Sequence, residues 1–336
     1  MRKKTGIAIA LIISLALTGC GFFNNEEAVI PEPGSKLGAV LDDMKVIPRP
    51  SDVTVHEEVI EISGLKREFE IVFSADNHIS LCDERDQAVA SKAKKRYEEF
   101  KCQDGSYADE SFKSVISYID SEKPDLVIFG GDMVDSAMYA GIDFVTEQLS
   151  ELKVPYLYGM GNHDFEYGDE YFSDRAFSEY LPRFASITDI EKGYQTIEYD
   201  ELSVMIADDY NNKISADALE ELRRICKKGK PVILSIHVPI EPATSNSLWD
   251  MSKMIWGYTP EGMSKVLLGN RSCIPDEVTA AFIDEITRDG SPVKVVMAGH
   301  IHFYHKDMLT ENTVQLVAGP GFNKEVTKII LKPSDK

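Results

Sequence analysis

Five short apolar segments of this sequence each end in residue types that bind metal ions in proteins. One of them, Val293–Ala298, is followed by Gly299-His300-Ile301-His302, in which one residue separates two histidines. Residues i and i+2 of an extended chain point to the same side, so both imidazoles can face one pocket. The other four segments end in Asp-Asn-His at 76–78, Gly-Asp-Met-Val-Asp at 131–135, Gly-Asn-His-Asp at 161–164 and His-Val-Pro at 237–239. Five of the seven histidines lie in these motifs, so we expect one site.

The spacing of apolar residues predicts an α/β fold. Helical periodicity is expected at residues 85–101, 110–121, 140–152, 216–228 and 276–288, and short apolar strands at 125–129, 154–158, 232–236 and 293–297. Strand pairs joined as hairpins are predicted at residues 53–62 with 67–74 and within 194–207, and further strands at 313–318 and 326–331. Open α/β sheets bind ligands at the carboxyl ends of their strands, which is where the five motifs lie.

The first nineteen residues have the pattern of a signal peptide. A basic start precedes an apolar stretch at residues 6–17, and Leu17-Thr18-Gly19-Cys20 resembles a bacterial lipobox. Cleavage there leaves Cys20 diacylated, which anchors the mature protein to the outer face of a membrane. An uncleaved transmembrane anchor is the alternative, but the stretch is shorter than the roughly 20 residues that a spanning helix needs. Residues 20–52 are predicted to be a tether, and residues 53–336 the folded domain.

The net charge of −20 argues against long nucleic acids as partners, because a basic surface is what binds them. The same charge also has a plain interpretation as a solubilising surface. The sequence shows no feature that points to a protein partner. The cysteines of the folded part allow three disulfide connectivities, and we predict no firm pairing, with Cys82–Cys102 favoured if one exists. No CxxC spacing occurs, so a zinc–thiolate site is not expected; the four residues are Cys82, Cys102, Cys226 and Cys273.

Asp, Asn and His side chains without thiolates suit divalent ions such as Mn²⁺, Fe²⁺ or Zn²⁺. Five segments rich in these residues supply more ligands than one ion needs. Two ions about 3.5–4 Å apart that share a carboxylate would use them all. The sequence therefore predicts two divalent metal ions as cofactors.

The five motifs in this order, DxH, GDxxD, GNHD, HxP and GHxH, resemble those of the calcineurin-like metallophosphoesterase superfamily. The resemblance covers about residues 69–302, which is most of the globular chain. It implies a four-layer αββα sandwich, in which two mixed β-sheets are flanked by helices. It also implies a metal-dependent phosphoric ester hydrolase that acts on small phosphomonoesters or phosphodiesters.

The resemblance assigns roles by matched position. It implies that one metal is bound by Asp76, His78 and His302, that the other is bound by Asn162, His237 and His300, and that Asp132 bridges the two. It further implies that a hydroxide between the ions attacks phosphorus and that His163 acts as general acid toward the leaving oxygen. Asp164 is expected to orient His163 and to favour its charged form.

Other polar residues near the motifs have less specific interpretations. Purple acid phosphatases, a related branch, have an iron-binding tyrosine where this chain has Asp135, so ordinary divalent ions are expected and Asp135 is predicted to support a ligand histidine. Asn77 is expected to face solvent, and His56 and His305 to lie on the surface. The pair Asp208-Asp209 lies outside every motif and is not assigned to the site.

Two insertions, near residues 79–108 and 241–274, exceed what the sheets need. The second contains both tryptophans of the chain, Trp249 and Trp256. Loops at strand ends commonly determine specificity, so a cap that contacts the substrate is one hypothesis, and a helix that packs its own apolar side is the other. Three functions stay open: a membrane-anchored phosphoesterase, which is the leading one, a surface lipoprotein whose metal site has no turnover, and a hydrolase of other esters.

Overall fold

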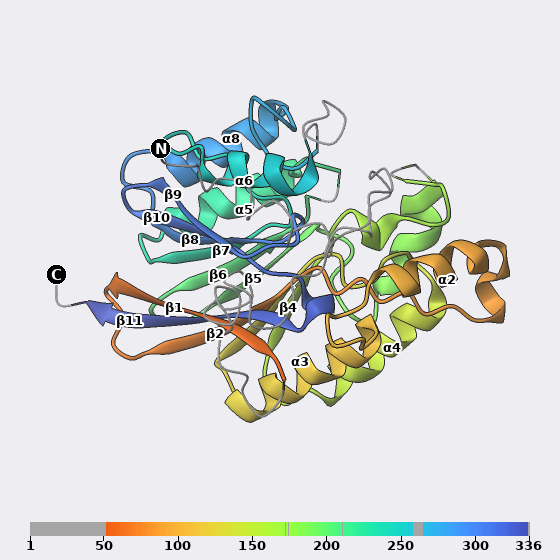
Figure 1. Ribbon diagram of the computed structural model, residues 1–336. Helices are drawn as coiled ribbons and strands as arrows, with labels where there is room; N and C mark the ends of the chain where they lie inside the picture. The colour runs from red at the N-terminus through yellow and green to blue at the C-terminus, as the bar shows by residue number, and fades with distance from the viewer. Residues whose placement is uncertain (1–51, 172, 174, 210, 258–264, 335–336) are drawn as a thin grey trace, which may run out of the picture.

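The computed structural model describes residues 52–171, 173, 175–209, 211–257 and 265–334, so the predicted signal peptide, Cys20 and nearly all of the tether lie outside the described residues. Two β-sheets form the centre of the molecule (Figure 1). The first sheet has the strand order β1-β11-β2-β3-β4. Its strands are β1 (Thr54–Ser63), β2 (Phe69–Ser74), β3 (Leu126–Gly130), β4 (Tyr156–Gly159) and β11 (Glu325–Ser334).

The second sheet has the order β5-β6-β7-β8-β10-β9. Its strands are β5 (Tyr194–Glu198), β6 (Ser203–Ala207), β7 (Val232–Ser235), β8 (Val293–Ala298), β9 (His305–Thr310) and β10 (Thr313–Val317). The strands β6, β7, β8 and β10 are parallel, and the two edge strands are antiparallel to their neighbours. This sheet is therefore mixed, and so is the first, in which β11 is parallel to β1 and antiparallel to β2. The predicted hairpin within residues 194–207 is confirmed as β5 and β6.

Helices cover the outer faces of both sheets (Figure 1). On the side of the first sheet lie α2 (Ala90–Glu99), α3 (Ala108–Glu122) and α4 (Tyr139–Glu151); on the side of the second lie α5 (Ala216–Cys226), α6 (Ser247–Trp256) and α8 (Glu277–Thr287). Short helical turns join them at Glu84–Val89, His163–Phe165, Ala176–Tyr180, Leu181–Phe184 and Gly321–Asn323. The predicted four-layer αββα sandwich is confirmed.

Apolar side chains between the sheets hold the two inner layers together. This inner core includes Phe73 and Ile128 from the first sheet, and Ile233 and Met297 from the second, all fully buried. Two further clusters fill the space between each sheet and its helices. The interior strands β3, β6 and β7 are buried on both faces, which explains why they are almost entirely apolar rather than alternating.

One predicted pairing is wrong. Strands β1 and β2 both form, but they do not pair as a hairpin, because β11 lies between them, parallel to β1 and antiparallel to β2. Strand β1 carries Glu57, Glu58 and Glu61 and is partly exposed, as suits the edge of a sheet. The more apolar β11 takes the interior position, which local sequence could not reveal. The edge strand β9 was also not predicted, because its sequence is mostly polar.

The motifs follow strands that run in the same direction. Strands β2, β3 and β4 are parallel, and so are β7 and β8, so each sheet presents its motifs at one edge. Within the first sheet, the N–H of Asp76 donates to Gly131 O (3.0 Å). Between the sheets, the backbone N–H of His300 donates to the Asp76 carboxylate (2.9 Å). This junction between the sheets is where the candidate site lies.

Among the described residues, no helix is both long and apolar enough to cross a membrane. The four cysteines of the folded domain are all free thiols, so neither Cys82–Cys102 nor another pair forms a disulfide.

Candidate metal centre

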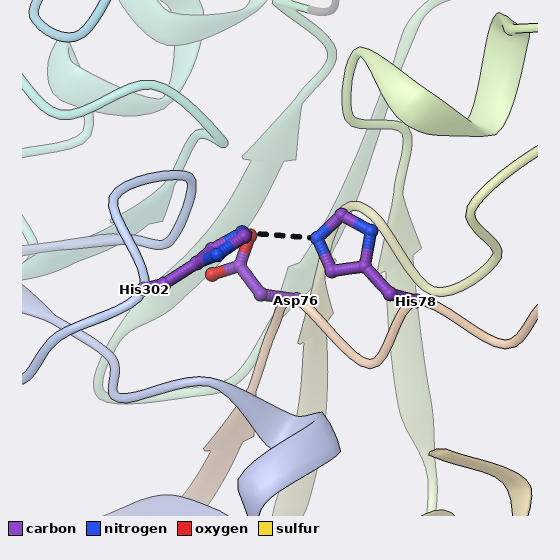
Figure 2. Close-up of side chains that lie close together, drawn as sticks. All are labelled: Asp76, His78 and His302. Atoms are coloured by element: carbon purple, nitrogen blue, oxygen red, sulfur yellow. Dashed lines mark hydrogen bonds and ion pairs between the residues drawn. The ribbon is translucent and has the colours of Figure 1, made fainter. Parts of the chain in front are cut away.

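The first group of candidate ligands, called group 1, consists of Asp76, His78 and His302. The Nε2 atoms of His78 and His302 lie 3.0 Å apart, and Nε2 of His302 lies 3.6 Å from Asp76 Oδ1. Figure 2 shows that the two rings approach each other from segments at opposite ends of the chain, with the Asp76 carboxylate beside His302. Each side chain thus offers one ligand atom to a common point.

The second group, called group 2, consists of Asp132, His237 and His300. Nε2 of His237 lies 3.1 Å from Asp132 Oδ2. The same carboxylate oxygen lies 3.8 Å from Nε2 of His78, which belongs to group 1. Asp132 therefore stands between the groups, and one of its oxygens faces a histidine of each.

Five of these six ligands have left-handed backbone conformations. The positive φ angles are 55° at Asp76, 47° at His78, 52° at Asp132, 72° at His300 and 55° at His302, out of nine described residues other than glycine with positive φ. Such conformations cost about 1–3 kcal/mol each and persist where the surrounding structure enforces them, commonly at functional sites. The sharp turns after each strand aim the ligands at one another.

Two glycines allow the motif loops to approach closely. A Cβ atom at Gly161 would collide with the backbone and carboxylate of Asp132, and one at Gly131 would lie 2.5 Å from Nδ1 of His237. Gly131 also has φ 94°, a conformation that other residues rarely adopt. These positions therefore explain the glycines of the Gly-Asp and Gly-Asn-His motifs.

The second ring nitrogen of several candidate ligands is already engaged. Nδ1 of His78 donates to Asp135 Oδ1 (3.1 Å), Nδ1 of His237 donates to Gly130 O (2.9 Å), and Nε2 of His300 donates to Lys265 O (2.7 Å). Metal-binding histidines use their other ring nitrogen in this way, which fixes the tautomer and the ring orientation. The predicted role of Asp135 as a support for a ligand histidine agrees with this contact.

Twelve buried polar side-chain atoms of the described residues have no hydrogen-bond partner, and two of them, Oδ1 of Asn162 and Nε2 of His237, belong to predicted metal ligands. An unsatisfied buried polar atom costs free energy, so a binding partner for such atoms is expected. Oxygen and imidazole nitrogen are ligands that Mn²⁺, Fe²⁺ and Zn²⁺ accept. The residues present therefore fit the predicted divalent ions. Asn162 precedes His163, whose N–H donates to Asp132 Oδ1 (2.8 Å), so its loop touches group 2.

The two groups differ in charge when no metal is bound. Burial lowers the pKa of His78 to about 4 and that of His300 to about 3, so both rings are neutral at pH 7. Burial also acts on His237, but the Asp132 carboxylate outweighs it and raises the pKa of this ring to about 10. Burial raises the pKa of Asp76 to about 7. Group 2 thus contains a charged imidazolium that must lose its proton before Nε2 can bind a metal.

Residues 69–304 match the family model described as calcineurin-like phosphoesterase, which is well over half of the chain. The chain belongs to the calcineurin-like phosphoesterase family. This phosphoesterase is accordingly a metal-dependent phosphoric ester hydrolase, as predicted from its sequence, and groups 1 and 2 are its candidate metal ligands.

Solved structures with a related fold include a dimetal phosphatase from Danio rerio, with 12% identity and a TM-score of 0.45 over 76% of this chain and 88% of that one. A purple acid phosphatase from yellow lupin (Lupinus luteus) seeds has 15% identity and a TM-score of 0.48 over 79% of this chain but 45% of that one. A calcineurin-like phosphoesterase from Bacillus subtilis has 12% identity and a TM-score of 0.41, over 76% and 82%. Curated proteins gave no match. Similarity at this level carries no information about the substrate.

The predicted general acid of the phosphoesterase, His163, lies next to both groups. Its ring stands edge-on to that of His78, with centroids 4.7 Å apart. Nδ1 lies 3.2 Å from Asp135 Oδ1 and 3.6 Å from Glu166 Oε2. Burial opposes a charge on this ring, but the carboxylates of Glu166, Asp132 and Asp135 raise its pKa to about 10. His163 therefore holds a proton at neutral pH.

Asp164 does not have the position that the sequence led us to expect. Its carboxylate accepts hydrogen bonds from the N–H groups of Asp132 (2.9 Å), Val134 (3.1 Å) and Gly161 (2.8 Å). The contacts of the described residues include none between this carboxylate and the His163 ring. The expectation that Asp164 orients His163 is wrong, because the helical turn at His163–Phe165 directs the two side chains apart. Asp164 instead fastens the loops that carry Asp132 and Asn162.

Several other expectations need correction. Asn77 is fully buried, and its Nδ2 donates to Ser74 Oγ and Met133 Sδ, so it does not face solvent. His56 and His305 are only partly exposed, and each contacts a carboxylate, Glu325 or Asp307 respectively. They lie outside both ligand groups, as predicted.

Sequence reasoning missed three residues that support the site. Asp209, which we did not assign, accepts the N–H groups of His237 and Val238, both at 2.8 Å. Glu166 lies beside His163, and Arg96 binds Asp135. A signal existed only for Asp209, which ends a strand as the true motifs do. Nothing in a charged sequence distinguishes Glu166 or Arg96 from other Glu and Arg residues.

The second insertion packs against the family's His-x-His turn. Helix α6 buries Leu248 and Trp249 in a cluster with Ile301 and Val317, as expected of a helix that packs its own apolar side. Nε1 of Trp256 donates to Ile301 O (3.0 Å), and its ring lies edge-on to His302 with centroids 5.4 Å apart. The indole therefore supports the turn, and a contact between Trp256 and substrate stays a prediction.

Proposed function

We propose that this protein uses two divalent metal ions to hydrolyse small phosphomonoesters or phosphodiesters at the outer face of a membrane, to which a lipid on Cys20 anchors it. The observation that carries the proposal is the position of Asp132. One oxygen of this carboxylate lies 3.1 Å from His237 and 3.8 Å from His78, so it can serve an ion in each group. A shared carboxylate is the usual bridge of a two-metal site.

The bound ions would acidify a water molecule and neutralise negative charge on the phosphoryl oxygens. The chain supplies the remaining requirements. Asp76, His78 and His302 would hold one ion, and Asn162, His237 and His300 would hold the other, with Asp132 as a ligand that both could share. In the hydrolysis, the oxygen of water bonds to phosphorus and the bond from phosphorus to the leaving oxygen breaks. The leaving oxygen needs a proton, and His163 is the candidate donor because it is protonated at neutral pH.

Anchoring rests on the sequence of residues 1–20 alone. A cleaved lipobox with a diacylated Cys20 would give stable membrane attachment, and residues 20–52, the predicted tether, would join the lipid to the folded domain. The substrate would then be a phosphate ester outside the cytoplasm. Labelling with a radioactive fatty acid tests this part; a Cys20→Ser variant should lose both the label and the membrane association.

The catalytic part is tested with the protein reconstituted in Mn²⁺ and assayed on chromogenic phosphomonoesters and phosphodiesters. We expect two ions per chain and turnover, and we expect His163→Ala to lower turnover about 10²–10⁴-fold with both ions retained. Two bound ions without turnover on any phosphate ester would instead favour the surface lipoprotein with a structural metal site. Turnover on carboxylic esters alone would favour the third function.

A further inference from the structure

The Asp135 carboxylate connects a candidate metal ligand to the candidate proton donor. Its Oδ1 lies 3.1 Å from Nδ1 of His78 and 3.2 Å from Nδ1 of His163, and its Oδ2 accepts a hydrogen bond from Ser80 Oγ (3.2 Å). The side chain is only 3% exposed. A small rotation of this carboxylate would therefore turn both imidazoles, so whatever fixes Asp135 also fixes the geometry of the site.

Arg96 fixes the Asp135 carboxylate with two hydrogen bonds. Its Nε donates to Oδ2 (2.8 Å) and its Nη2 donates to Oδ1 (2.6 Å), a two-pronged contact that allows one orientation of the carboxylate. A third nitrogen, Nη1, donates to Glu99 Oε2 (3.1 Å), which in turn limits rotation of the guanidinium. The Arg96 side chain is 13% exposed, so these bonds form largely away from water.

The same turn of α2 also packs on His78 directly. Phe100, four residues after Arg96, stacks on the His78 ring with centroids 4.1 Å apart and an angle of 9° between the planes. The Arg96 guanidinium also lies over the Phe100 ring, 4.5 Å from its centroid. Residues i and i+4 of a helix share a face, so one helical turn holds His78 both by stacking and through Asp135.

We propose that Arg96 is a positioning residue of the metal centre: by holding the Asp135 carboxylate, it keeps His78 aligned for metal binding and His163 aligned toward the leaving oxygen. The part that concerns His163 rests on the proposed function, whereas the part that concerns metal binding does not. Arg96 belongs to the first insertion, near residues 79–108. That insertion therefore supports the metal centre through the contacts of Arg96 with Asp135 and of Phe100 with His78.

A purely structural role is the competing explanation, because any buried carboxylate needs a partner. The chain offers a matched control. Arg183 has a side chain 10% exposed and lies 3.5 Å from the buried Asp86 on the same side of the molecule. Asp86 accepts bonds from the Tyr139 N–H and the Tyr167 hydroxyl and touches no ligand histidine. Arg183 also donates to Ala137 O, but among the described residues its side chain contacts neither Asp135 nor a ligand histidine. Arg183→Met thus removes an equally buried arginine without removing a support of these residues.

The test measures Mn²⁺ binding to the metal-free full-length protein by electron paramagnetic resonance. Loss of a group that orients a ligand typically weakens metal affinity about 10–100-fold, which we expect for Arg96→Met at one of the two ions. Arg183→Met should bind Mn²⁺ within about twofold of the wild type. Arg96→Lys keeps the charge but not the two-pronged contact, so its affinity should fall about three- to tenfold.

The kcat values for two phosphate esters provide a second test. Phenyl phosphate has a poor leaving group and depends on proton donation, whereas p-nitrophenyl phosphate depends on it less. In Arg96→Met the kcat for the phenyl ester should fall at least about fivefold more than that for the p-nitrophenyl ester. Arg183→Met should change both equally.

Each outcome decides the proposal. Equal Mn²⁺ affinity in Arg96→Met and Arg183→Met, or wild-type affinity in either Arg96 variant, would overturn it. If Arg96→Met does not fold, Arg96→Lys carries the test. If the wild type hydrolyses neither ester, the proposed function fails, and Mn²⁺ binding alone still decides whether Arg96 positions the centre.

Discussion

The two ligand groups contain the same kinds of residue but are supported in different ways. In group 1, His78 donates to the side chain of Asp135, which Arg96 holds in turn. In group 2, His237 and His300 donate to main-chain carbonyls, those of Gly130 and Lys265. A main-chain carbonyl that accepts a hydrogen bond from a histidine is positioned by the fold, and substitution of one side chain does not remove it. A side-chain support can be removed, so group 1 is open to adjustment by mutation and group 2 is not.

The largest effect should come from the residue that belongs to both groups. Asp132→Ala removes the carboxylate whose Oδ2 lies near an imidazole ring of each group, so we expect loss of both ions and a fall in turnover of more than about 10³-fold. Metal analysis and kcat measure this. The exposed Asp289, changed to Ala, is the control for a lost aspartate. An Asp132→Ala protein that retains one tightly bound ion would show that the groups are independent.

A smaller effect should distinguish the side-chain support of group 1 from the main-chain support of group 2. Asp135→Asn weakens the acceptor for His78, so the affinity for one Mn²⁺ should fall about 10–100-fold. Asp209→Asn alters a carboxylate that holds the backbone of His237, where the ring itself stays bonded to Gly130 O. We expect this variant to have a lower melting temperature than the wild type but nearly the same metal affinity. Equal losses of Mn²⁺ affinity in the two variants would remove the distinction between the groups.

The smallest effect is a difference in pH dependence. The pKa of His237 is raised to about 10 beside Asp132, so a metal that enters group 2 must displace a proton, and its affinity should fall about tenfold for each pH unit below 10. In group 1, His78 is neutral because its pKa is lowered to about 4, and Asp76, with a pKa of about 7, is charged above pH 7. Affinity there should be flat from about pH 8 to 10 and fall as the pH drops through 7, where Asp76 becomes protonated.

Calorimetry in buffers with different ionisation enthalpies measures the protons released. At pH 8 we expect about one proton released by the ion that enters group 2 and none by the ion that enters group 1. Proton release by both ions, or by neither, would contradict the assigned charges. The metal-free Asp132→Asn variant is the control: it lacks the carboxylate that keeps His237 protonated, so an NMR titration should find a lower pKa for His237 than in the metal-free wild type.

The sequence predicts much of this arrangement, for a physical reason. Motifs such as 161–164 follow apolar strands, and parallel strands bring their carboxyl ends to one edge, so local pattern and sheet geometry together gather the ligands. Strand neighbours are set by contacts distant in sequence, which is why the place of β11 between β1 and β2 was missed. Arg96 was missed because its helix also contains Lys94, Lys95 and other charged residues, and nothing in the neighbouring sequence distinguishes Arg96 from them.

Asp164 shows the opposite error. Its position directly after His163 suggested a partnership, but neighbours in a tight turn point in different directions. Within this segment, the residue that does approach the His163 ring is Glu166, three positions further on, where one helical turn returns the chain to the same side. Adjacency in sequence is thus a weaker guide to side-chain contact than helical spacing is.

The pairing of β11 has a consequence for the order of events during folding. This strand is the latest of the chain and fills the gap between the two earliest, β1 and β2. Until it emerges from the ribosome or the export channel, the first sheet is split and Asp76 lacks the neighbouring segment whose Phe322 N–H bonds to its carbonyl. Because such long-range closure is slow, the chain should acquire its metals only at the end of folding, outside the cell if export occurs unfolded.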